Sequence, residues 1–172
     1  MRWTRSALGP AAVVCLVLGA AGCGPPHHPG ARPSDRPSAS SAAPSVRALA
    51  ADYLAVAKPA NHRLDVEVSA YAKHASHDLA AAAAALRAQA ATERHFDRQL
   101  AAIPFPPAIA ATASALIRVN EIRARLTEHQ AAATSIPALL SFADSHKAAD
   151  AEVEAQVRVI RAELGLPPPE SS

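Results

Sequence analysis

The sequence is poor in aromatic residues, cysteine and glycine. Its 172 residues include one tryptophan, two tyrosines, three phenylalanines and two cysteines, and no glycine occurs between Arg47 and Leu164. Half of the residues are apolar, but the excess is alanine, so the expected core is thin and alanine-rich. A long stretch without glycine that is rich in strong helix formers predicts long helices.

The chain also lacks a strong excess of charge of either sign. It has 17 lysine and arginine residues against 15 aspartate and glutamate residues, and two of the basic residues, Arg2 and Arg5, lie in an expected leader. The remaining chain is nearly neutral and has no basic stripe interleaved with aromatic residues. These features exclude a nucleic-acid-binding protein.

The first 22 residues are typical of an export signal. Arg2 and Arg5 precede an apolar stretch over residues 7–21, which Gly9 and Pro10 interrupt and which is too short for a comfortable bilayer span. Residues 20–23, Ala-Ala-Gly-Cys, resemble the bacterial lipobox, with alanine in place of the commoner leucine three positions before Cys23.

This resemblance implies that the leader is removed and that Cys23 carries a diacylglycerol. Two acyl chains anchor a protein stably, so we expect an exported protein held by Cys23 on the outer face of the cell membrane. The alternatives are ordinary secretion after cleavage near Ala21, or an uncleaved anchor. Because Cys15 lies in the leader, no thiol would remain for a disulfide or a thiolate metal site.

The mature chain is expected to form one domain between two disordered segments. Residues 23–44 are rich in proline, serine and alanine, which predicts a flexible linker, and residues 166–172 are expected to form a disordered tail. Between them, residues 45–165 are long enough for one helical domain.

Four helices of similar length are expected in this domain, over residues 45–74, 77–103, 107–133 and 136–164. The breaks are inferred from Ser76 as a helix cap, from the prolines of residues 104–107, and from Ser135 as a second cap. Short connections between equal helices predict an all-α, up-down-up-down four-helix bundle. Pro59 lies inside the first helix, so a kink or a break is expected there.

Polar residues interrupt the apolar stripe of every expected helix near its middle. Counting residues from the turns places these side chains at one level of the bundle. The members of this candidate buried layer are Asn61, Asp65, Glu93, Asn120, Arg123, His146 and Asp150.

Two interpretations of this layer are open. In the first, the residues satisfy one another: Arg123 neutralises Glu93 or Asp150, and His146 bonds Asp65 or Asp150, which fixes the register of the helices. In the second, the layer binds a small ligand or a metal, with Glu93, His146 and Asp150 as the ligand set. The bridged diiron pattern of two Glu-x-x-His pairs is absent, and Arg123 would repel a cation.

No catalytic role and no cofactor are expected, because the sequence has no nucleophile elbow and no phosphate-binding loop. The expected partners are the membrane, through the lipid on Cys23, and an unidentified envelope protein or small ligand. The sequence thus predicts a membrane-anchored envelope lipoprotein with a helical binding or structural module.

Most of the chain resembles small actinobacterial lipoproteins of uncharacterised function. The similarity includes the leader, the linker and four segments of the body, residues 58–61, 91–94, 105–107 and 146–150. It implies export, lipid anchoring and a helical body, and it implies no ligand or activity.

Overall fold

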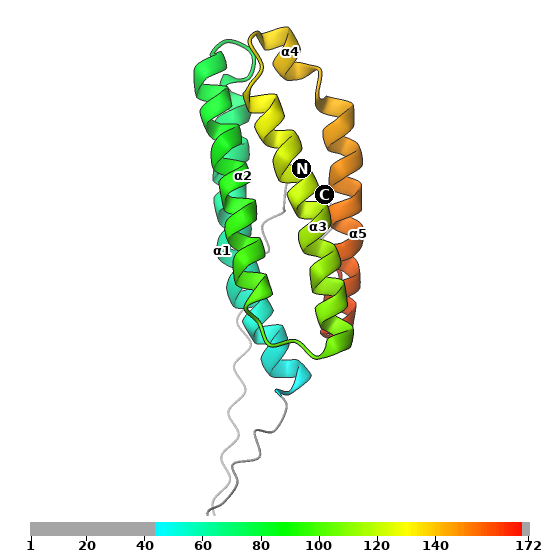
Figure 1. Ribbon diagram of the computed structural model, residues 1–172. Helices are drawn as coiled ribbons and strands as arrows, with labels where there is room; N and C mark the ends of the chain where they lie inside the picture. Colours follow the sequence, from blue (N-terminus) through cyan, green and yellow to red (C-terminus); the bar gives the residue numbers. More distant parts are fainter. Residues whose placement is uncertain (1–43, 170–172) are drawn as a thin grey trace, which may run out of the picture. The chain divides into compact units, whose positions relative to one another are not determined.

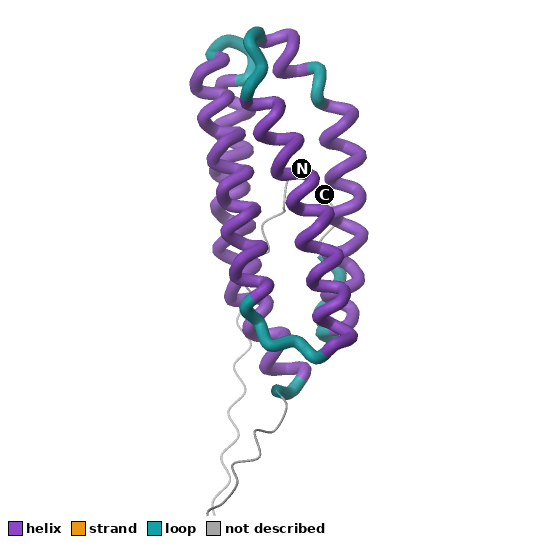
Figure 2. Tube along the Cα trace, viewed as in Figure 1, coloured by secondary structure: helices purple, strands orange, loops and turns teal. Residues whose placement is uncertain are grey.

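The computed structural model describes residues 44–169 of the chain, and this part is all-helical, without a strand (Figure 2). The expectations for the leader, for Cys23 and for the linker up to residue 43 lie outside the described residues. The helices are α1 (Val46–His74), α2 (Leu79–Ala101), α3 (Pro107–Ala131), α4 (Ile136–Leu140) and α5 (Ala143–Glu163).

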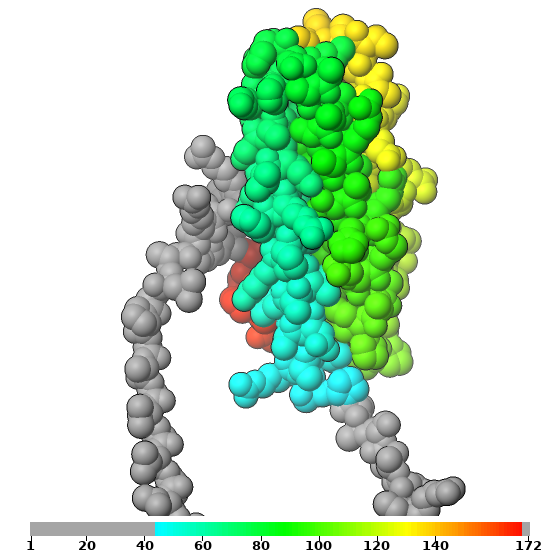
Figure 3. All heavy atoms as spheres, turned by 90° about the vertical axis from the view of Figure 1, so that its left-hand side faces the viewer, coloured from blue at the N-terminus to red at the C-terminus, as the bar shows by residue number. Residues whose placement is uncertain are grey.

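The four long helices lie along one another, and each runs back beside the one before it (Figure 1). Close backbone approaches join α1 to α2, α2 to α3, and α3 to α5. Figure 3 shows α1 and α2 packed side by side. The side between α1 and α5 is the most open, because few backbone positions of these two helices come close.

α1 begins at Ser45, whose side chain accepts a hydrogen bond from the backbone N–H of Ala48 at 3.2 Å. The helix then continues through Pro59 to His74 without a break. Of the two outcomes expected at Pro59, the break is therefore wrong. Pro59 lies on the exposed side of the helix, where the carbonyl that loses its helical N–H partner can bond to water instead.

The cap of α2 is Asp78 and not Ser76, so the prediction from the sequence was wrong here. The Asp78 carboxylate accepts from the backbone N–H of Ala81 at 2.9 Å, and α2 starts at Leu79. Ser76 Oγ lies 3.3 Å from His77 Nδ1 instead. A carboxylate at this position also interacts favourably with the positive end of the helix dipole.

The last expected helix, over residues 136–164, is two helices. Ser135 caps α4 as predicted, by accepting from the N–H of Ala138 at 3.3 Å, but the helix ends at Leu140. The carbonyl of Ala138 accepts from Ser141 Oγ at 2.7 Å, and that of Leu139 accepts from Gln130 Nε2 at 2.8 Å. Because side chains satisfy these carbonyls, the chain can turn before α5 without leaving buried polar groups unpaired.

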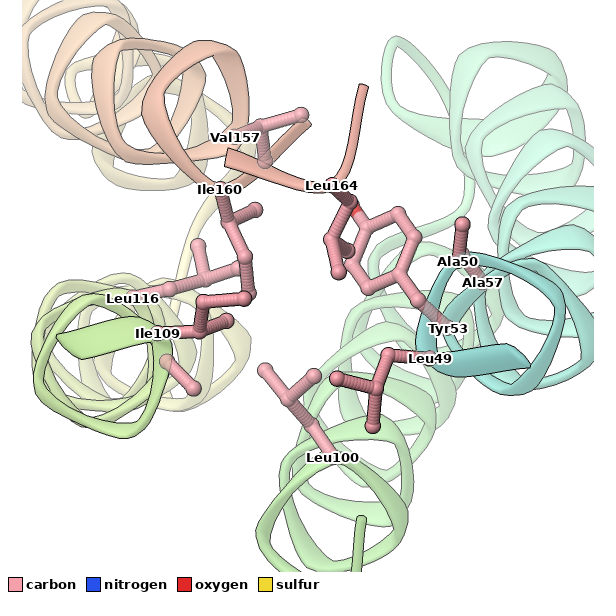
Figure 4. Packing of buried hydrophobic residues seen from close by; sticks show 11 residues of the cluster. Leu49, Ala50, Tyr53, Ala57, Leu100, Ile109, Leu116, Val157, Ile160 and Leu164 are labelled. Carbon is pink, nitrogen blue, oxygen red and sulfur yellow. The ribbon is translucent and has the colours of Figure 1, made fainter. Parts of the chain in front are cut away.

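The apolar core consists of two clusters. The first cluster lies where the chain enters α1 and contains the large side chains shown in Figure 4; its members include Leu49, Tyr53, Leu100, Ile109, Leu116, Val157, Ile160 and Leu164. The second cluster lies near α4 and is mostly alanine; its buried members are Ala75, Ala82, Ala83, Leu86, Ala131 and Leu139. The mid-helix residues of the expected polar layer fall between the two clusters.

Beyond α5, Gly165 has a φ of 65°, which a residue with a side chain rarely adopts. The N–H of Gly165 donates to the carbonyl of Ala162, and the N–H of Leu166 donates to the carbonyl of Arg161 at 2.8 Å. This pair of hydrogen bonds is the Schellman motif, which ends a helix. Leu166, which was expected to begin a disordered tail, packs against the first cluster. Arg161 Nε also donates to the carbonyl of Pro167 at 2.7 Å.

Among residues 44–169, no helix combines the length and the apolar character needed to cross a bilayer.

Candidate functional site

Arg123 of α3 lies between two carboxylates at the middle of the domain. Its Nη1 is 2.7 Å from Glu93 Oε1 of α2, and its Nε is 2.6 Å from Asp150 Oδ1 of α5. Glu93 is only 1% exposed. The sequence left Glu93 and Asp150 as alternative partners of Arg123, and the structure shows that one guanidinium pairs with both.

These two contacts are ion pairs without well-aligned hydrogen bonds. Both Oε atoms of Glu93, Oδ1 of Asp150 and Nε of Arg123 are buried and have no hydrogen-bond partner of good geometry. One guanidinium charge therefore faces two carboxylates, and the carboxylates keep acceptor positions that no aligned donor fills. Buried acceptors in this state cost free energy until a donor reaches them.

Asn120 of α3 bonds to α2, to a residue that was not predicted from the sequence. Its Nδ2 donates to Asp97 Oδ1 at 2.9 Å and to the backbone carbonyl of Glu93 at 3.4 Å. Asp97 lies one turn after Glu93 on the same face of α2. We call Glu93, Asp97, Asn120, Arg123 and Asp150 the polar layer.

Burial controls the ionisation of the two acids on α2. Burial raises the pKa of Glu93 to about 7, with a smaller contribution from the charges of Asp150 and Asp97 and against the charge of Arg123, which lowers it. Burial also raises the pKa of Asp97 to about 6, against the hydrogen bond from Asn120. Near neutral pH, Glu93 therefore exists in both protonation states.

His146 of α5 lies beside the layer but is not bonded into it. Its Nε2 is buried without a hydrogen-bond partner, so the expected bond to Asp65 or Asp150 is not made through this atom. Burial lowers the pKa of His146, and although the charge of Asp150 raises it, the burial effect is larger. The imidazole is therefore neutral at pH 7.

Asn61 and Asp65 of α1 face two cavities instead of the ion pairs. A central cavity of about 260 Å³ is lined by side chains from all four long helices. Its polar lining residues include Asp65, Gln89, Arg123, Gln130, His146 and Asp150, and its apolar lining residues include Leu64, Val68, Leu86 and Leu140. A smaller cavity of about 60 Å³ adjoins it, shares Leu64 and Arg123, and is lined by Asn61 and Glu93.

Further polar residues of this region were not predicted from the sequence. Gln89 is 7% exposed, lines the central cavity, and its Nε2 has no hydrogen-bond partner. Gln130 Nε2 donates to Tyr71 Oη at 3.0 Å, and Thr92 Oγ1 donates to Glu67 Oε1 at 2.8 Å. A signal was available for Gln89, because it lies four residues before Glu93 on the same helix face.

The structure does not bring Glu93, His146 and Asp150 together as the metal site that the sequence suggested. Within residues 44–169, no three His, Cys, Asp or Glu side chains lie close enough together to hold a metal ion. Arg123 contacts both Glu93 and Asp150, so its guanidinium occupies the place where a cation would bind them. The set Glu93, His146 and Asp150 therefore does not fit a metal.

Comparison with known proteins assigns no function to this site. No family model, no curated protein and no solved structure matches the chain.

Proposed function

We propose that this chain is a lipid-anchored protein of the cell envelope, and that its helical domain binds a small ligand in the central cavity without catalysing a reaction. The observation that carries the binding role is the central cavity itself: it is walled by all four long helices and lined by buried polar atoms that lack partners. Ligand sites combine apolar walls with a few convergent polar groups in this way.

The described helices support the bundle architecture proposed for this domain, which is up-down-up-down with α4 as a short insert before the last helix. The close approaches follow the order of the chain (Figure 1), and the side chains of the first apolar cluster lie between the helices (Figure 4). The architecture requires each long helix to run antiparallel to the long helix before it. A crystal structure in which two consecutive long helices ran parallel would overturn it.

The lipid anchor is supported by the sequence before the domain. The leader and the lipobox-like residues 20–23 fit a lipoprotein signal peptidase, and Cys23 is the acyl acceptor they imply. We expect that Cys23→Ala, expressed from the full gene in a bacterium that lipidates such proteins, leaves the membrane fraction. Cys15→Ala is the matched control, and it should stay membrane-bound. Equal membrane retention of the two variants would rule out the anchor.

The size of the central cavity suits a molecule of several heavy atoms. About 10–15 Å³ of such space holds one water molecule, so 260 Å³ is far more than the polar groups need for bridging waters. We expect ligand-induced amide shifts in the full-length chain to concentrate at the lining residues of α1, α2, α3 and α5. Shifts confined to the outer faces of these helices would contradict a binding role for the cavity.

A structural role of the polar layer is the second candidate, and one observation favours it. Arg123 joins α2 to α5 through two ion pairs, which penalises any sliding of these helices past α3. The two roles share Arg123 and Asp150, but Asp65, Gln89 and His146 line the cavity without joining the ion pairs. Variants of these three residues therefore separate ligand binding from the structural role.

A further inference from the structure

We infer that the central cavity takes a small organic cation, a protonated amine that also carries a hydroxyl or carbonyl oxygen, with its ammonium group at Asp65 and Asp150. This inference rests on the proposed binding role of the cavity and adds the chemistry of the ligand. Four observations carry it: the charge of the wall, the unused acceptors, the unused donor and the apolar lining.

The charged groups that face the cavity sum to a negative site. α1 contributes Asp65, α3 contributes Arg123 and α5 contributes Asp150, while α2 contributes the neutral Gln89. Arg123 already pairs with Glu93 and Asp150, so Asp65 is left without a compensating cation on the wall. Such a site favours a ligand that carries a single positive charge and disfavours an anion.

Asp150 also has hydrogen-bonding capacity that Arg123 does not use. Its carboxylate lines the cavity, and its Oδ1 lies 2.6 Å from Arg123 Nε without an aligned donor. An ammonium group offers three donors in rotatable directions and can bond to Asp65 and Asp150 from within the cavity. The imidazole of His146, which is neutral, adds no competing charge beside Asp150.

Gln89 specifies the second polar group of the ligand. It is more than nine-tenths buried, it lines the cavity, and its amide nitrogen lacks an acceptor among the described residues. A buried amide donor without a partner is destabilising by about 1–3 kcal/mol. A hydroxyl or carbonyl oxygen on the ligand completes this group, and Leu64, Val68 and Leu86 form an apolar wall for the carbon chain between the two ends.

The test compares three linear compounds of matched length that differ at one end: aminopentanol, pentanediol and hydroxypentanoate. Each is titrated into the full-length, isotope-labelled chain in detergent, and the amide shifts are followed by NMR. We expect aminopentanol to shift the amides of residues near 65, 89, 146 and 150, to bind at least about tenfold more tightly than the diol, and the anion to bind most weakly. This order supports the inference.

Two variants on α1 make the test specific. Asp65→Asn removes a wall carboxylate that takes no part in the ion pairs, so we expect the fold to persist and the affinity for aminopentanol to fall several-fold while that for the diol is unchanged. Asp52→Asn, at an exposed position of the same helix, is the matched control and should leave both affinities unchanged. Equal losses in the two variants would overturn the assignment of Asp65.

The outcomes separate this inference from the proposed function. Preference for the diol or the anion, with shifts at the cavity, overturns the cationic ligand and leaves the cavity as a binding site. Absence of cavity shifts with all three compounds overturns both statements. Weaker binding of every cavity ligand to Gln89→Leu than to the unchanged chain supports the role of the amide, and unchanged binding overturns it.

Discussion

Glu93 lies in an environment that is unusual for a glutamate. It is a carboxylic acid buried among helices, with Arg123 as its nearest cation and with Asp97 and Asp150 as unfavourable neighbours. Because its pKa is raised to about 7 in the folded chain, the folded state binds a proton more tightly than the unfolded state does. Loss of this proton therefore weakens the fold.

Replacement of Glu93 by glutamine tests this protonation. The free energy of unfolding of the unchanged protein should fall relative to that of Glu93→Gln as the pH rises through about 4.5 to 7, by roughly 3 kcal/mol in total at about 1.4 kcal/mol per pKa unit. Urea unfolding at several pH values measures the difference. Asp97 and His146 titrate in both proteins, so their effects on pH dependence largely cancel in this comparison.

The exposed residue Glu152 provides the control for this experiment. Glu152→Gln should follow the pH dependence of the unchanged protein, because this side chain lies on the outer face of α5. If Glu93→Gln also followed it, Glu93 would be ionised at all of these pH values, and the account of its burial would be wrong.

The sequence predicted four of the five residues of the polar layer and missed Asp97. Glu93, Arg123 and Asp150 interrupt apolar stripes, and the structure brings them into contact. Asp97 was missed because an aspartate beside the large apolar Phe96 is not expected to be the more buried of the two, yet Phe96 is only half-buried and Asp97 is 7% exposed. The hydrogen bond from Asn120, which no pattern in α2 reveals, holds Asp97 inside.

At the scale of the helices, the sequence predicted the segments well and the ends less well. A glycine-free stretch of helix formers accounts for α1, α2 and α3, and proline separates α2 from α3. The ends depend on which of several polar residues makes the cap, as at Ser76 and Asp78. The turn between α4 and α5 depends on Gln130, a residue of another helix, and local sequence does not contain that information.

The cap of α2 can be tested by exchanging its two candidates. Asp78→Ala removes the acceptor of the Ala81 N–H and should lower the free energy of unfolding by about 1 kcal/mol. Ser76→Ala, two residues earlier in the same turn, should have no measurable effect. Urea unfolding of both variants measures this, and a larger loss at Ser76 would restore the cap predicted from the sequence.

At the scale of the whole molecule, the described helices pack against one another. Both apolar clusters, the polar layer and the caps of α1, α2 and α4 are formed by residues between 44 and 169. These contacts join all five helices. We therefore expect the domain to bury its apolar residues without a contribution from the leader or the linker.

A fragment of residues 44–172 should accordingly fold without the lipid anchor. We expect a strongly helical circular dichroism spectrum and a single cooperative thermal transition, because the buried residues of the domain lie on contacting helices. The full-length chain in detergent is the reference for both measurements. A fragment spectrum typical of coil, or a gradual melt, would show that residues before 44 stabilise the domain.

The unequal composition of the two clusters has a consequence for local opening. Alanine buries far less apolar area than leucine or isoleucine, so the second cluster holds the α4 end with less free energy than the first cluster holds the opposite end. Backbone amides of α2 near Leu86 should therefore exchange with deuterium faster than those near Leu100, in the same helix. The central cavity borders the weaker end through Leu86 and Leu140, so fraying of this end gives a solute a route to the interior.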